Sequence, residues 1–157
     1  MNTGKVLVGN FGSPDRLNYT CLGDNVNLAS RLEGLNKYYG TEIIVSGTVF
    51  DNVQEHFVCR TLDSVAVKGK SVPTKVHELI AFRALASELL LQKVELYEQA
   101  YNLYCEANFL EAKLRFEKFL RLQPDDLPAE KHMSQCEIML LEPPGAFWRP
   151  IVVLEGK

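Results

Sequence analysis

The order of hydrophobic and polar positions divides this chain into two parts of different character. Over residues 1–82, short runs of alternating apolar and polar positions are separated by turn residues, which predicts strands with a few helices. Beyond Phe82 the strand signal stops, and apolar residues recur every three or four positions as far as Leu141, which predicts packed helices. We therefore expect an α+β part at residues 1–82, a helical part at 83–142 and a tail at 143–157.

The first part predicts a hairpin followed by a helix. Strands are expected over residues 5–10 and 17–22, joined by a turn at 12–16 that contains a proline and an aspartate. The helix is expected from Asp24 to about Tyr38, with Asp24 as its N-cap and Gly40 just past its end. Its apolar positions are expected at Val26, Ala29 and Leu32. The remaining elements are a strand at 42–45, a short helix capped by Ser46 and ending at Val53, and strands at 57–67 and 74–81.

The second part predicts two helices and a covering third helix. The segment from Leu85 to Pro124 resembles one tetratricopeptide-type helical hairpin, although Leu96 and Ala100 stand where that pattern has Trp and Gly. A third helix over residues 127–141 is expected to cover the hairpin, because a lone repeat cannot bury its own apolar side. In the tail, Trp148 is the expected anchor that holds the chain end against the body.

The distribution of charge and the spacing of cysteines argue against several classes of function, among them nucleic-acid binding and zinc binding. The net charge is −3, with eight Lys or Arg against eight Asp or Glu through Ile80, and nine against twelve after it. Neither part has the concentrated positive charge of a nucleic-acid surface. The four cysteines show no CxxC spacing, which predicts reduced thiols rather than a zinc site or disulfides. No apolar run is long enough for a membrane span. We expect a cytoplasmic location, or the cytoplasmic part of a longer, membrane-anchored protein.

Candidate chemistry is concentrated in residues 18–33, which read NYTCLGDNVNLASRLE. Asn27 and Arg31 lie four residues apart on the expected helix, so both project from one face. A guanidinium fork beside an amide suits a phosphate-bearing ligand, and a plain amphipathic helix is the alternative explanation. Gly69-Lys70-Ser71 does not complete a P-loop, because its first glycine is replaced by Ser64 and a strand follows.

Residues 4–46, which include VNLASRLE, together with RTLDSVAVKGKSVPTKVHEL at residues 60–79, resemble the second half of the class III adenylyl and guanylyl cyclase catalytic domain. The resemblance implies a partial ferredoxin-like domain of class α+β. It also implies that Asn27 orients the ribose of the nucleotide and that Arg31 stabilises the reacting phosphate. Lys68, in the VKGK turn, would reach the triphosphate as a point charge.

Thr20 is the implied purine contact, because it stands three residues before Gly23. A Thr at this position is similar to the subgroup of soluble, bicarbonate-responsive adenylyl cyclases, which favours ATP over GTP. The alternative is that Thr20 is an ordinary β-branched strand residue.

The resemblance also implies Mg²⁺ or Mn²⁺, held in the family by two Asp residues in the first half of the domain. No such motif precedes Gly4, so we assign no metal ligand in this chain and expect the fragment alone to be inactive. The expected function is the C-terminal part of an adenylate cyclase that makes cyclic AMP and diphosphate from ATP at an interface of two catalytic domains, in a homodimer. The alternative is a non-catalytic, cyclase-like scaffold whose helices bind a protein partner.

Overall fold

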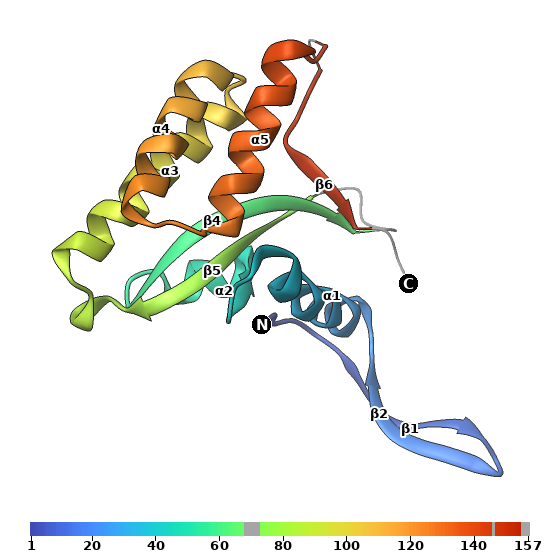
Figure 1. Ribbon diagram of the computed structural model, residues 1–157. Coiled ribbons are helices and arrows are strands. Elements are labelled where there is room, and N and C mark those ends of the chain that lie inside the picture. Colours follow the sequence, from blue (N-terminus) through green and yellow to red (C-terminus); the bar gives the residue numbers. More distant parts are fainter. Residues whose placement is uncertain (68–72, 146, 155–157) are drawn as a thin grey trace.

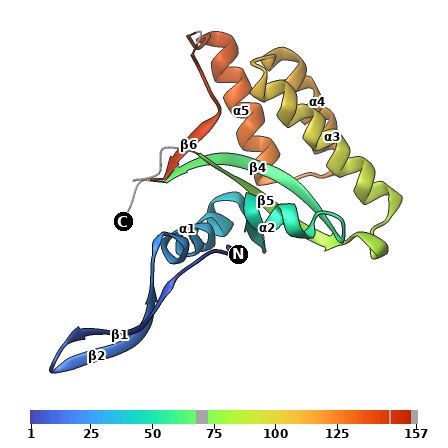
Figure 2. The same cartoon turned by 180° about the vertical axis from the view of Figure 1, so that it is seen from behind.

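The computed structural model describes residues 1–67, 73–145 and 147–154. A sheet with the order β3-β5-β4-β6 lies between two layers of helices (Figure 1). Helices α1 and α2 cover one face, and α3, α4 and α5 cover the other, as the reverse view confirms (Figure 2). The mixed α+β class predicted from the pattern is confirmed. Below, residues 1–82 are called the N-terminal portion, 83–142 the helical portion and 143–157 the tail.

The bounds of the elements agree closely with the predicted ones. The predicted bounds of α2, β4 and α5 match the observed ones at both ends, those of β1, β2, α1, β3 and β5 differ by up to three residues, and β6 was not predicted as a strand. The elements are β1 Leu7–Ser13, β2 Arg16–Leu22, α1 Asp24–Tyr39, β3 Ile44–Ser46, α2 Gly47–Val53, β4 Phe57–Val67, β5 Thr74–Phe82, a 3₁₀ turn at Arg83–Leu85, α3 Glu88–Cys105, α4 Phe109–Leu122, α5 Leu127–Leu141 and β6 Ile151–Leu154.

Strands β1 and β2 form an antiparallel hairpin that extends away from the rest of the molecule (Figure 1). Its turn is tighter than predicted, because Ser13 pairs with Arg16 and leaves only two residues between the strands. Gly12 has a φ of +140°, and a Cβ there would lie 2.0 Å from the Arg16 carbonyl oxygen. A glycine is therefore required for this close approach of the two strands.

Helix α1 packs on the sheet through a row of buried residues spaced three and four apart. This row is Leu28, Leu32, Leu35 and Tyr39, and it meets Ile44, Leu62, Val65 and Val76 of the sheet. The prediction that Val26 and Ala29 belong to the buried row is wrong, since both are only half-buried. Only Leu32 belongs to both the expected and the observed row, because the buried face of α1 is displaced by about one residue from the expected face.

The helical portion has its own core. Helices α3 and α4 form the predicted hairpin and α5 packs against α4, around a cluster of aromatic and small side chains that includes Tyr97, Ala112 and Phe116. The tetratricopeptide likeness and the domain bounds stay predictions. The expected anchor of the tail is confirmed: Trp148 packs edge-on against Tyr104 and Phe109. Beyond it, β6 joins the sheet parallel to β4.

The two portions meet along β4, where Arg60 is almost fully buried. Its Nε lies 2.7 Å from a Glu78 carboxylate oxygen on the neighbouring strand, and its Nη2 lies 2.8 Å from Asp126. Asp126 is also the N-cap of α5, where its other oxygen accepts from the Ala129 N–H at 3.0 Å. The guanidinium lies over the Tyr97 ring at 4.6 Å. A buried charge is tolerated here because two carboxylates and an aromatic face replace water.

A β-bulge next to Arg60 provides further contacts between the portions. Thr61 pairs with His77 and Asp63 with Val76, so Leu62 is the extra residue of β4. The Leu62 carbonyl accepts a hydrogen bond from His132 Nε2 at 2.8 Å, and the Thr61 N–H donates to Glu98 of α3. Side chains of the helical portion thus satisfy backbone groups at the irregular part of the strand.

Replacing Asp126 with Ala is expected to lower the free energy of unfolding by about 3–5 kcal/mol, because it leaves a buried guanidinium without one of its partners and removes a helix cap. Urea denaturation followed by circular dichroism measures this. Glu137→Ala, which removes an exposed partner of Lys113, is the control and should barely move the midpoint. Equal midpoints for the two variants would contradict a joining role for the Arg60 ion pairs.

Candidate functional site

Gly23 stands at the start of the helix that carries two of the predicted site residues, Asn27 and Arg31. Gly23 is the N-cap of α1 and has a φ of +141° and a ψ of 165°, a conformation that side chains rarely adopt. The expectation that Asp24 is the cap is wrong: no side chain caps this end, and Asp24 is the first helical residue. A carboxylate in the first turn still favours the helix through its dipole.

Asn27 and Arg31 are brought together as predicted. Both lie within α1, one turn apart, on positions adjacent to the buried Leu28 and Leu32. Asn27 is exposed and Arg31 is half-buried. The Arg31 Nη1 atom is shielded from solvent and has no hydrogen-bond partner among the described residues. Because a buried donor without a partner costs about 1–3 kcal/mol, an acceptor added at this face would be stabilising.

Thr20 lies on the projecting hairpin rather than beside the helix pair. It is exposed on β2, where it pairs with Gly9 of β1. It precedes α1 by only a few residues, and no side-chain hydrogen bond within the described part of the chain joins it to Asn27 or Arg31. Lys68 lies outside the described residues. The strand that leads to it, β4, ends at Val67.

The described residues contain no cluster of three metal-ligand side chains. In residues 1–67, 73–145 and 147–154, no group of three or more His, Cys, Asp or Glu side chains is placed to hold an ion.

Over the same ranges, no helix combines the length and the apolar composition that crossing a bilayer requires.

The N-terminal portion has known relatives. The family model of the adenylate and guanylate cyclase catalytic domain matches residues 1–82, which is half of the chain. This chain belongs to that family. The resemblance seen in VNLASRLE and VKGK therefore reflects membership in the cyclase family.

Individual relatives support the same family. The terminal-differentiation specific adenylate cyclase of Dictyostelium discoideum is 34% identical over 140 residues, covering 87% of this chain and 7% of the relative. Adenylate cyclase 1 of Rhizobium meliloti is 41% identical over 80 residues, covering 51% and 12%. This chain thus spans only a small part of these relatives. Among solved structures, the adenylyl cyclase CyaB from P. aeruginosa is 34% identical, covers 52% of this chain and 41% of that chain, and has a TM-score of 0.41.

The alignment with the Dictyostelium relative extends into the helical portion. Residues 1–82 cannot supply 87% of this chain, so the aligned region continues past Phe82. The similarity therefore includes sequence outside the cyclase family model.

Two histidines that the sequence left without a role are buried parts of the structure. His132 lies at the junction of the two portions, and His77 stacks on Phe50 with ring centroids 4.0 Å apart. Arg60 and Asp63 were likewise not singled out from the sequence. No local signal marks any of them, because their partners come from distant segments.

The burial of His77 predicts a pH dependence of stability. Burial lowers the pKa of His77 to about 4, below its ordinary value of 6.5. Between these values the unfolded chain binds a proton that the folded chain does not, so stability falls as the pH drops from about 7 towards 4. His77→Gln should remove about 1–2 kcal/mol of the loss between pH 7 and pH 5 in urea titrations. His56→Gln, at an exposed histidine, is the control, and an unchanged loss in His77→Gln would contradict the assignment.

Proposed function

We propose that this chain is the C-terminal part of an adenylate cyclase catalytic domain, which converts ATP to cyclic AMP and diphosphate. The observation that carries the proposal is the helix pair of Asn27 and Arg31 in a chain of the cyclase family, with the Arg31 Nη1 atom unpaired among the described residues. Relatives named as adenylate cyclases support ATP as the substrate, and so does Thr20 at the purine-contacting position.

The reaction is attack of the ribose 3′ oxygen on the α-phosphorus, with diphosphate as the leaving group. In the proposed roles, Asn27 holds the ribose so that this oxygen is in line with the phosphorus, which lowers the entropic part of the barrier. Arg31 donates to the phosphate oxygens on which negative charge increases in the transition state. Lys68 would attract the triphosphate, and Thr20 would accept from or donate to the purine edge. The Mg²⁺ or Mn²⁺ ligands are expected outside this chain.

Exposed apolar side chains on the β1-β2 hairpin support an assembly with a second catalytic domain. Its strands carry large apolar side chains in contact with solvent, among which Leu7, Leu17 and Tyr19 are well over half exposed. Soluble proteins seldom expose several large apolar side chains on one hairpin unless another surface covers them. We expect that a second cyclase domain, in a homodimer of the longer protein, supplies this cover and the metal-binding carboxylates. A protein partner for the helical portion and a cytoplasmic location remain part of the proposal.

The isolated chain is expected to form no cyclic AMP from ATP with either Mg²⁺ or Mn²⁺, because it holds only the nucleotide-orienting residues. A longer protein that includes the first half of the catalytic domain should be active. In that protein, Arg31→Ala should lower kcat by roughly 100- to 1,000-fold, as expected when a charge-stabilising donor is removed. Asn27→Ala should act in the same direction. Cyclic AMP formation is measured by chromatography.

Lys37→Ala is the matched control, since Lys37 is an exposed residue in the last turn of the same helix. It should leave kcat unchanged. Full activity of an Asn27→Ala, Arg31→Ala double variant would favour the scaffold alternative. Robust cyclic AMP synthesis by the isolated chain would contradict the proposed incompleteness.

A further inference from the structure

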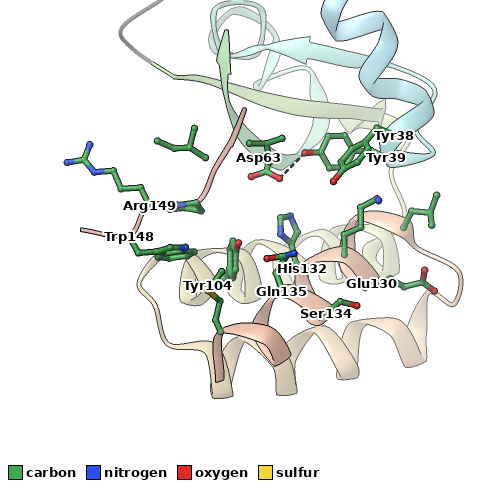
Figure 3. A pocket seen from close by; sticks show the side chains of 16 residues that line it. Tyr38, Tyr39, Asp63, Tyr104, Glu130, His132, Ser134, Gln135, Trp148 and Arg149 are labelled. Atoms are coloured by element: carbon green, nitrogen blue, oxygen red, sulfur yellow. Dashed lines mark hydrogen bonds between the residues drawn. The ribbon is translucent and has the colours of Figure 1, made fainter. Parts of the chain in front are cut away.

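A cleft of about 610 Å³ lies between the two portions, apart from the proposed nucleotide-binding residues. Its walls come from the end of α1, from β4, from Tyr104 of α3, from α5 and from the tail (Figure 3). None of Thr20, Asn27 and Arg31 lines it. Its size is that of a site for a small molecule, and sites of this kind often form where two portions of a chain meet.

The inner wall of the cleft carries a buried carboxylate. Asp63 is 5% exposed and lines the cleft from β4. One of its oxygens accepts from the Tyr39 hydroxyl at 2.8 Å, and the other accepts from the Ser64 backbone N–H at 3.2 Å. A carboxylate has about four acceptor positions, so two remain open. Among the ion pairs of the described residues, none includes Asp63.

His132 adds a second acceptor beside Asp63. Its Nε2 donates to the Leu62 carbonyl, and burial lowers its pKa, which favours the neutral ring, whose Nδ1 is an acceptor. Figure 3 shows the His132 ring directed from α5 towards the Asp63 carboxylate across the cleft. Two acceptors that face a common space favour a ligand group with several N–H donors.

The remaining walls are aromatic. Tyr104 and Trp148 stand together on one side of the cleft with ring centroids 5.3 Å apart, and Tyr38 lies on the other side (Figure 3). The negative faces of such rings attract cations as well as apolar surface. Burial also raises the pKa of the Asp63 carboxyl, which means that its charged form gains from a nearby cation.

The cations that line the cleft are placed away from this inner wall. The Lys131 ammonium lies over the Tyr38 ring at 3.9 Å. Arg149 is exposed, and Figure 3 shows its guanidinium directed outwards at the rim. An anionic ligand would therefore meet the Asp63 carboxylate, whereas the Lys131 ammonium already contacts the Tyr38 ring.

We infer that this cleft binds a small organic cation, an arylalkyl primary amine, with its ammonium group between Asp63 and His132 and its ring against Tyr104 and Trp148. The ammonium supplies further donors to Asp63 and a donor to His132 Nδ1, and it offsets the buried charge of Asp63. The site is separate from the proposed catalytic residues, so amine binding does not depend on the proposed function.

The test uses three probes of one shape: 2-phenylethylamine, the neutral 2-phenylethanol and the anionic 3-phenylpropanoate. Binding is followed by calorimetry and by the fluorescence of Trp148, which is the single tryptophan of the chain. The amine should bind at least tenfold more tightly than the other two and change the Trp148 emission. Equal binding of the alcohol, tighter binding of the anion, or no amine binding at millimolar concentration would overturn the inference.

Asp63→Asn keeps the side-chain volume and should weaken amine binding at least tenfold, whereas Glu137→Gln, at an exposed carboxylate outside the cleft, should leave it unchanged. Circular dichroism checks that Asp63→Asn is folded. If it is not, Ser134→Phe provides a second test, because Ser134 is an exposed residue of α5 at the cleft and a larger side chain there blocks entry. Undiminished amine affinity in a folded Asp63→Asn or in Ser134→Phe would place the amine elsewhere.

Discussion

The buried guanidinium of Arg60 is the constraint on which the arrangement of the two portions depends. A charge removed from water needs compensating partners, and Arg60 finds one in its own sheet, Glu78, and one in the helical portion, Asp126. Because Asp126 also begins α5, the position of that helix and the pairing of the ion are linked. The helical portion is therefore part of the environment of β4 and not an appendage joined only through the chain.

The β-bulge at Leu62 extends this dependence. An extra residue in a strand leaves backbone groups without ladder partners, and here side chains of α3 and α5 satisfy them. The same bulge changes the direction of the following residue, Asp63, relative to a regular strand. The carboxylate that lines the cleft is thus a consequence of how β4 is held, and β4 leads directly towards the segment that contains Lys68.

The two sites considered above differ in how their residues are positioned. Asn27 and Arg31 are neighbours through helix geometry alone, so their relation needs only that α1 forms. Asp63, His132 and Trp148 come from a strand, a helix and the tail, and they meet only in the folded molecule. The first arrangement persists in any chain that keeps α1, whereas the second requires both portions and the tail.

Local pattern determined most of the elements of this protein. The bounds of α5 and β4, the presence of a hairpin with its turn near Pro14, and the position of Asn27 one turn from Arg31 follow from periodicity, glycine and proline positions, and spacing. Resemblance to a known family, rather than periodicity or spacing, marked VNLASRLE as a cyclase motif. The face of α1 that is buried was misassigned at Val26 and Ala29, because apolar side chains lie on more than one face of that helix and only packing against the sheet selects the buried row. Tertiary structure decided the pairing of Arg60 with Asp126, the burial of both His77 and His132, and the cleft at Asp63. The residues that form these contacts are far apart in the sequence, by seventy positions in the case of Leu62 and His132. Neither spacing nor composition indicates such a contact, because it forms only when the chain folds.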